Sequence, residues 1–182
     1  MVSGSLCVGV VVVITGSDSA KEKDAKRRMF NPESGEAQAD ILIASENAKF
    51  ADTHARVGLL PTWGLSVRLP QKVGVGLARR MSLTGDYLSA DEALRAGLVT
   101  EVVTHDELLP AARRVAATIA GNNQKAVRAL LASYHRIDAD QTSSALWLEA
   151  EAARAWMRST TGDDIAASRS GVMARGRTQV RP

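Results

Sequence analysis

Cysteine is almost absent from the sequence, which holds only Cys7. A single cysteine excludes an internal disulfide framework and any metal site built on cysteine pairs. Histidine is also scarce, and His54, His105 and His135 lack the close spacing that metal ligands show. We therefore expect neither a bound metal nor a resident cofactor.

Aromatic residues and long apolar runs are also few. Aromatics make up 4% of the 182 residues, so the core is expected to be aliphatic. No apolar run approaches the roughly 18 residues of a membrane-spanning helix, so we expect no membrane span. Residues 5–15 are apolar, but no basic segment precedes them and no small-residue cleavage site follows. A signal peptide is not expected, and a cytoplasmic location is the default.

The charge balance is mild. The net charge is +3, and charged residues make up an ordinary 24% of the chain. A balance of this kind does not indicate a nucleic acid as partner. With 45% hydrophobic residues, the chain is long enough to bury a core.

The strongest strand prediction covers residues 7–15, where four consecutive valines favour a strand buried on both faces. Gly16-Ser17-Asp18 then indicates a turn. The charged run at residues 20–28 is either a solvated helix face or a loose loop, and its basic residues leave phosphate binding open as an alternative.

Residues 40–103 alternate between strand and helix signals. Residues 41–44 form a short apolar run that is consistent with a buried strand, although four residues alone do not exclude a helix, and residues 98–103 alternate like a strand. A helix is expected after Gly64, interrupted at Pro70 and again at Gly74. Ser89 and Glu92 have the spacing of a capping box, and Gly97 is the expected left-handed stop for the helix that follows them.

The chain beyond residue 103 is predicted to be helical. A second capping box is expected at residues 104–107. Helices are then predicted over residues 108–119, 124–136 and 142–159, with a last one capped at residues 162–164. Trp147 and Trp156 are interpreted as core or subunit-contact residues rather than ligand-stacking ones.

Many short motifs of the central stretch occur in one characteristic order. These are Asp40-Ile41, Ala44, Ala48, Phe50, Gly58, Pro61, Gly64, Arg68-Leu69, Gly74, Leu83-Thr84-Gly85-Asp86, Ser89-Ala90, Ala93, Ala96-Gly97-Leu98-Val99 and Val102-Val103. The succession resembles the enoyl-CoA hydratase/isomerase, or crotonase, family. The resemblance covers residues 39 to about 165 well and 8–18 weakly, and it does not extend to 19–38.

The resemblance implies an α/β fold, a spiral of short strands and helices with a helical C-terminal region. It places an incomplete spiral core at residues 1–103 and the helical region at residues 104–182. Measured against the family pattern, several tens of residues are missing between the first strand and the central stretch.

The family's chemistry centres on a thioester carbonyl that gains negative charge. Two backbone N–H groups stabilise that oxyanion, and the resemblance places their segments at the turn after residue 15 and at residues 30–38. Hydratases add two glutamates for general acid–base work. In this chain the two matching positions read Ser34 and His54.

His54 is the predicted catalytic residue, because histidine exchanges protons near neutral pH and Asp52 is close enough in sequence to orient it. The alternative is a polar loop residue without a role. The resemblance implies that Leu60, Trp63 and Gly64 bind the acyl part of the substrate. Trp63 either walls the pocket or packs beneath its turn, and the N-terminal dipole of the helix after Gly64 favours developing negative charge.

The implied substrate is an acyl-CoA thioester, with coenzyme A entering as part of the substrate. The predicted function is therefore an acyl-CoA-binding protein similar to enoyl-CoA hydratases and isomerases, in fatty acyl-CoA metabolism. The alternative is a catalytically inactive crotonase-fold remnant with an oligomerisation or interaction role. A homotrimer or hexamer is the expected assembly. The arginines of the tail, Arg169, Arg175, Arg177 and Arg181, are either a solubilising end or ligands of a CoA phosphate.

Overall fold

The computed structural model describes residues 10–13 and 40–166 of the chain. The chain divides into two compact units, each described here by itself. Unit 1 comprises Met1–Lys49 and Ser89–Leu130, and unit 2 comprises Phe50–Leu88 and Leu131–Pro182. The division into residues 1–103 and 104–182 stays a prediction. Cys7, the charged run at 20–28, Ser34 and the tail arginines lie outside the described residues.

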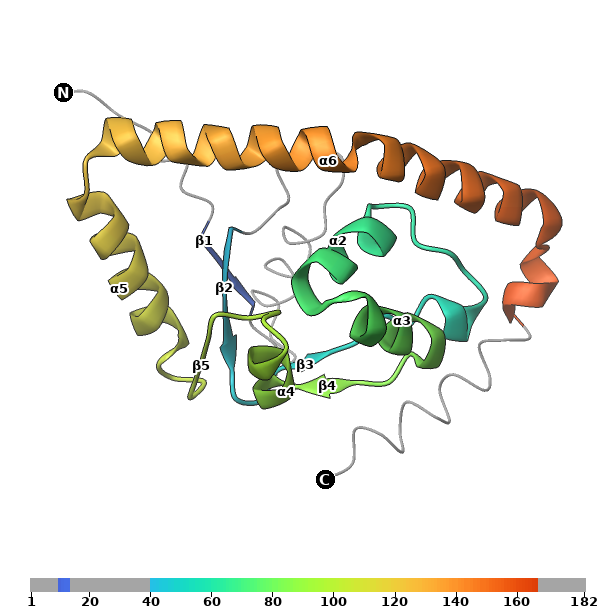
Figure 1. Cartoon of the computed structure of the whole chain (residues 1–182). Coiled ribbons are helices and arrows are strands. Elements are labelled where there is room, and N and C mark those ends of the chain that lie inside the picture. Colours follow the sequence, from blue (N-terminus) through green and yellow to red (C-terminus); the bar gives the residue numbers. More distant parts are fainter. Residues whose placement is uncertain (1–9, 14–39, 167–182) are drawn as a thin grey trace. The chain divides into compact units, whose positions relative to one another are not determined.

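Unit 1 is built on a three-stranded parallel sheet (Figure 1). Its strand order is β1-β2-β5, formed by β1 (Val10–Val13), β2 (Ile41–Ser45) and β5 (Glu101–Val103). Val10 pairs with Ile41, and Ile43 pairs with Glu101. The predicted strands at 7–15, 41–44 and 98–103 are thus confirmed in their described parts, although β5 is shorter than expected.

Helix α5 (Leu108–Gly121) packs on this sheet and closes the core of unit 1. Ile43, Leu108, Ala111 and Ala112 are buried together. This cluster is aliphatic, as the low aromatic content predicts. The capping box expected at residues 104–107 is wrong, because Glu107 is the N-cap and its side chain makes no capping bond. The Glu107 N–H bonds instead to the carbonyl of Thr104, so a backbone turn replaces the box.

A second, two-stranded sheet pairs β3 (Lys49–Phe50) with β4 (Leu88–Ser89). Helix α4 (Ala90–Arg95) begins at the end of β4, and its predicted capping box is present. The Glu92 N–H donates to Ser89 Oγ at 3.3 Å, and the Ser89 N–H donates to Glu92 Oε2 at 2.8 Å. Gly97 follows with φ 76°, as expected for a left-handed stop.

Unit 2 contains a short 3-10 helix, η2 (Ala55–Val57), and the helices α2 (Leu65–Val73) and α3 (Val75–Thr84). Gly74 separates α2 from α3 as predicted, but the break expected at Pro70 is wrong, because α2 runs through it. Proline lacks the N–H that would bond to the carbonyl of Ser66, four residues earlier. Ser66 is exposed, so water can take the place of the missing bond.

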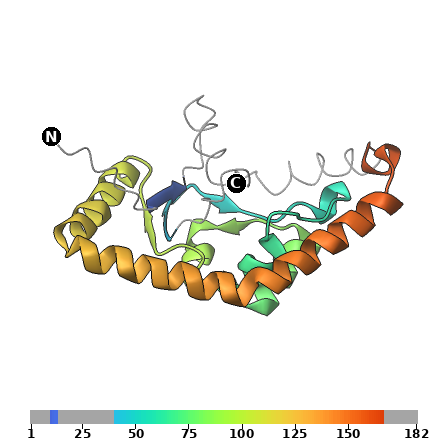
Figure 2. The ribbon, with the colours of Figure 1, turned by 90° about the horizontal axis from the view of Figure 1, so that it is seen from above.

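Helix α6 (Gln124–Ser159) is a single helix of 36 residues, continuous in both views (Figures 1 and 2). The two separate helices predicted at 124–136 and 142–159 are therefore wrong. Residues 137–141 contain neither glycine nor proline, so nothing in them stops a helix. The hydroxyl of Thr142 donates to the Asp138 carbonyl at 2.7 Å within this helix.

The predicted last helix is present as a short turn over residues 162–166, but residues 162–164 lie inside it, and the Asp164 N–H donates to the hydroxyl of the preceding Thr161. Among the described residues, no helix is long and apolar enough to cross a membrane. Short strands and predominant helices give the predicted mixed α/β fold.

Candidate functional site

His54 stands at the start of η2, in a turn that comprises residues 52–58 and is called here the His54 turn. Its Nδ1 lies 2.7 Å from Oδ1 of Asp52, and its backbone N–H donates to the same oxygen at 3.1 Å. The Asp52 side chain is 3% exposed, whereas that of His54 is 24% exposed. A carboxylate on Nδ1 holds the neutral imidazole with its proton on that nitrogen, which leaves the Nε2 lone pair as a proton acceptor.

The indole of Trp63 forms an edge-to-face contact with this imidazole. The two ring centroids are 5.8 Å apart, and the ring planes meet at 68°. Trp63 is 55% exposed, so it is not packed beneath its turn. The structure therefore brings His54 and Trp63 together, with a partly open tryptophan beside the imidazole.

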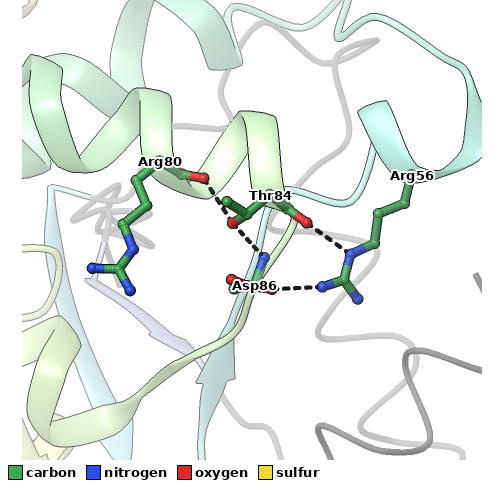
Figure 3. A network of polar contacts seen from close by, with 4 residues as sticks. All are labelled: Arg56, Arg80, Thr84 and Asp86. Atoms are coloured by element: carbon green, nitrogen blue, oxygen red, sulfur yellow. Dashed lines mark hydrogen bonds and ion pairs between the residues drawn. The ribbon is translucent and has the colours of Figure 1, made fainter.

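Arg56 fastens the His54 turn to the C-terminal end of α3 (Figure 3). Its Nε donates to the Thr84 carbonyl at 3.1 Å, and its Nη2 lies 2.9 Å from Oδ1 of Asp86. The Arg56 side chain is 4% exposed. A buried guanidinium on a carbonyl at the helix C-terminus complements the negative end of the helix dipole.

Gly85 makes this approach of Arg56 possible. It caps α3 with φ 66°, in the left-handed region that favours glycine. A Cβ at this position would lie 2.5 Å from Nε of Arg56. The Arg56 side chain thus packs against the predicted turn at Thr84-Gly85-Asp86 and bonds to it.

Helix α6 contacts the other end of the His54 turn. The indole Nε1–H of Trp156 donates to the Gly58 carbonyl at 2.9 Å. In Figures 1 and 2 the C-terminal part of α6 runs alongside the segment that contains η2. Trp156 is 40% exposed, so its position is set by this hydrogen bond rather than by full burial.

Glu149 of α6 binds the N-terminal end of α2. Its Oε2 accepts from the Gly64 N–H at 2.5 Å, and its Oε1 accepts from the Ser66 N–H at 2.7 Å. Glu149 is 9% exposed. The free N–H groups and positive dipole end of a helix favour an anion at this position. The Glu149 carboxylate therefore supplies the negative charge that the N-terminal dipole of α2 favours.

Sequence reasoning missed Glu149, although a signal was present. The apolar stripe of α6 contains Leu146, Ala150 and Ala153, and Glu149 falls within it. An acid on the buried stripe of a helix needs a partner, because burying an unpaired charge is costly. Its partner, the Gly64 N–H, is 85 residues away in sequence.

Leu60 lies at a cavity of about 560 Å³ in unit 2, between α2 and α6. Its apolar lining includes Leu60, Pro61, Val67, Pro70, Ala145 and Leu148. Glu149 also lies on its wall. His54 and Trp63 do not line this cavity. Of the predicted site residues, His54 and Trp63 contact each other, whereas Leu60 lies at the cavity.

Gly64 is buried and adopts φ 80° at the N-cap of α2. A Cβ at this position would lie 2.7 Å from Cδ2 of Leu146. Glycine is thus required for the close approach of α6. Substrate binding by Leu60, Trp63 and Gly64 stays a prediction, as does catalysis by His54.

The described part of the chain contains no group of three or more His, Cys, Asp or Glu residues that could hold a metal ion. The two oxyanion segments implied by the family, after residue 15 and at 30–38, lie outside the described residues.

Comparison with known proteins places this geometry in a family. The model of the enoyl-CoA hydratase/isomerase family matches residues 36–168. The chain is 39% identical over 140 residues to a probable peroxisomal enoyl-CoA hydratase of Arabidopsis thaliana, covering 75% of this chain and 52% of the relative. It is 39% identical over 113 residues to a crotonyl-CoA hydratase of Syntrophomonas wolfei, covering 62% and 44%.

Solved structures agree. A crystal structure of an enoyl-CoA hydratase from Mycobacterium smegmatis is 88% identical, with a TM-score of 0.66, covering 67% of this chain and 56% of that one. The chain spans about half the length of the relatives that it matches. The family match at residues 36–168 includes the whole stretch from 39 to about 165 that the resemblance covers. The chain belongs to the enoyl-CoA hydratase/isomerase family.

Proposed function

We propose that this chain binds an acyl-CoA thioester and transfers a proton at its α-carbon through His54. The observation that carries the proposal is the pair formed by Asp52 and His54, with 2.7 Å between Oδ1 and Nδ1. The choice of an acyl-CoA thioester as substrate is supported by the match to the enoyl-CoA hydratase/isomerase family and by the similarity to a crotonyl-CoA hydratase.

The pair is suited to reversible proton transfer. The Nε2 lone pair of His54 accepts the α-proton while the C–H bonding electrons pass into the enolate of the thioester. The imidazolium that forms is stabilised by the buried Asp52 carboxylate. Because the His54 side chain is 24% exposed, its new N–H exchanges with solvent before the proton returns to carbon.

The apolar cavity supports the binding part of the proposal. Its volume of about 560 Å³ lies in the range of small-molecule sites, which is roughly 300–1,000 Å³. Leu60 and Pro61 line it and belong to the segment between the His54 turn and Trp63. An acyl chain is the apolar portion of the proposed substrate that suits such a lining.

Water addition is expected to be slow. The family's hydratases use two glutamates, and the matching positions in this chain are Ser34 and His54. Loss of one oxyanion donor alone typically costs about 10²–10³ in kcat, and neither family donor motif is present in the sequence. Proton exchange needs one acid–base group, whereas hydration as the family performs it uses two.

The test is exchange of the α-protons of butyryl-CoA in D₂O, followed by proton NMR. The parent chain should exchange them faster than an enzyme-free blank. His54→Ala should lower the enzymatic rate by about 10²-fold or more, which is the usual contribution of a general base. His105→Ala is the matched control, because His105 is an exposed histidine of unit 1.

The outcomes separate three cases. Exchange lost in His54→Ala and kept in His105→Ala supports the proposal. Equal rates in His54→Ala and the parent would show that His54 takes no part. No exchange above the blank by the parent would overturn the proposal and favour an interaction role for the fold without catalysis.

We also propose that the chain self-associates, as a homotrimer or a hexamer, through α6. Large apolar residues stay exposed on the part of α6 in unit 2: Tyr134 60%, Ile137 52%, Trp147 59% and Leu148 58%. Exposed apolar residues gathered on one element are typical of an interaction surface. Sedimentation of only a monomer at micromolar concentration would rule this out.

A further inference from the structure

We infer that Glu149 is a positioning residue for His54, acting through Gly64 and Trp63. The inference rests on the proposed function of His54, but its first readout is independent of any activity. This positioning role of Glu149 in the candidate site is separate from the self-association that we propose for α6.

The first step of the argument is the geometry of the carboxylate. Each oxygen of Glu149 accepts a different backbone N–H, from Gly64 at 2.5 Å and from Ser66 at 2.7 Å. Two bonds from one rigid, planar group fix both the position and the direction of the backbone that they hold. The start of α2 is thereby tied to α6.

The second step is the link from this backbone to the imidazole. Trp63 directly precedes Gly64, and its ring makes an edge-to-face contact with the His54 ring, with 5.8 Å between the centroids. Trp63 is 55% exposed, so core packing does not hold it. The bonds of Glu149 to the neighbouring backbone are therefore the contacts that place this indole.

The third step is the lack of an equivalent support. The other residue of α6 that bonds to this region is Trp156, whose indole N–H reaches Gly58 at the far end of the His54 turn. Asp52 and Arg56 hold the turn itself. Leu146 of α6 also lies close to Gly64, but among the hydrogen bonds described above those of Glu149 alone hold the segment that carries Trp63.

The experiment begins with Glu149→Gln in the full chain. Glutamine keeps the shape but offers one oxygen, so one of the two N–H groups loses its acceptor. Glu151→Gln is the matched control, because Glu151 is an exposed acid two residues further along α6. Ala78→Gly, in the middle of α3, lowers stability without touching the site.

The first readout is the imidazole NMR spectrum of histidine-labelled protein. The ring-current contribution of Trp63 is defined as the shift of the His54 lines between the parent and Trp63→Leu. We expect Glu149→Gln to lose at least half of this contribution, and both controls to keep it. An unchanged contribution in folded Glu149→Gln overturns the inference.

The second readout is α-proton exchange of butyryl-CoA. Small displacements of catalytic geometry cost up to about 10²-fold, and we expect a loss of about tenfold or more in Glu149→Gln. A lost ring-current contribution with unchanged exchange would overturn the role in positioning for catalysis. Absence of exchange in the parent would sink the proposed function, while the NMR readout still decides whether Glu149 places Trp63.

A second variant covers the case in which Glu149→Gln does not fold. Glu149→Asp keeps the charge but shortens the reach by one methylene. We expect it to show the same two losses in smaller measure. If folded Glu149→Asp matches the parent in both readouts, the distance of the carboxylate is immaterial and the inference fails.

Discussion

Gly85→Ala should destabilise the protein strongly, and its cost can be worked out from the structure. Gly85 has φ 66°, and holding alanine in the left-handed region costs about 1–2 kcal/mol. The new Cβ would lie 2.5 Å from Nε of Arg56 and 2.8 Å from its Cδ and Cγ. The Arg56 side chain is 4% exposed, so it cannot swing aside without leaving its partners.

Displacement of Arg56 adds a second cost. Its hydrogen bond to the Thr84 carbonyl involves a charged donor and is worth about 1.5–3 kcal/mol. The ion pair with Asp86 is left out of the sum, because Asp86 is 46% exposed and water can replace its partner. The total is about 2.5–5 kcal/mol, or a melting temperature lower by about 5–20 °C.

Urea denaturation of a double-mutant cycle with Arg56→Ala tests this reasoning. In the Arg56→Ala background, Gly85→Ala should cost only the backbone share of about 1–2 kcal/mol. Equal costs in both backgrounds would refute the proposed collision with Arg56. Gly76→Ala is the control of opposite sign: a Cβ there meets nothing within 4 Å, so the change should stabilise α3 by up to about 1 kcal/mol.

Two further predictions concern the C-terminal part of the chain. Trp156→Phe should lower the free energy of unfolding by about 0.5–1.5 kcal/mol, because the bond to the Gly58 carbonyl is lost; Trp147→Phe, at an exposed indole, should change it little, and equal losses in urea denaturation would contradict this. The backbone and hydroxyl of Thr161 lower the pKa of Asp164 below its ordinary value of 3.8. The contribution of Asp164 to the stability of the turn at 162–166 is therefore fully present above pH 3.8 and lost as the pH falls through the lower, folded pKa. The amide shift of Thr161 should titrate with a midpoint below 3.8, and a midpoint at or above that value would contradict the contact.

The features that sequence predicts well are those decided by near neighbours. The Ser89 and Glu92 capping box forms because both partners lie within one helical turn. The left-handed stop at Gly97 depends on that residue's own freedom. The strand at 41–44 follows from its apolar run and the polar residues that bound it.

Predictions from short sequence patterns fail where another arrangement of the nearby backbone satisfies the same hydrogen-bonding groups. The spacing of residues 104–107 is that of a capping box, yet a backbone bond between Glu107 and Thr104 takes its place. Pro70 deprives the carbonyl of the exposed Ser66 of one bond, which is too small a cost to end α2. Residues 137–141 include the polar Asp138, Asp140 and Gln141, but these polar residues do not interrupt α6.

In the candidate site, the choice of His54 follows from the register of the family pattern, and its nearness to Asp52 follows from a separation of two residues in the sequence. The contact of Trp63 with the imidazole could not be predicted, because it depends on how the turn is folded. The bonds of Glu149 and Trp156 join residues 85 and 98 positions apart. No pattern of near neighbours encodes such pairings.

The supports of the His54 turn have a consequence for how this scaffold changes in evolution. The turn is held by the guanidinium of Arg56, the indole bonded to Gly58 and backbone bonds to the His54 carbonyl, none of which uses the side chain at position 54. Of the hydrogen bonds in the turn described above, the one between Asp52 and Nδ1 is therefore the bond that involves the side chain for which we propose acid–base work. If our proposal for His54 holds, a substitution at this one position changes the acid–base group while the bonds of Arg56, of Trp156 and of the His54 carbonyl stay in place.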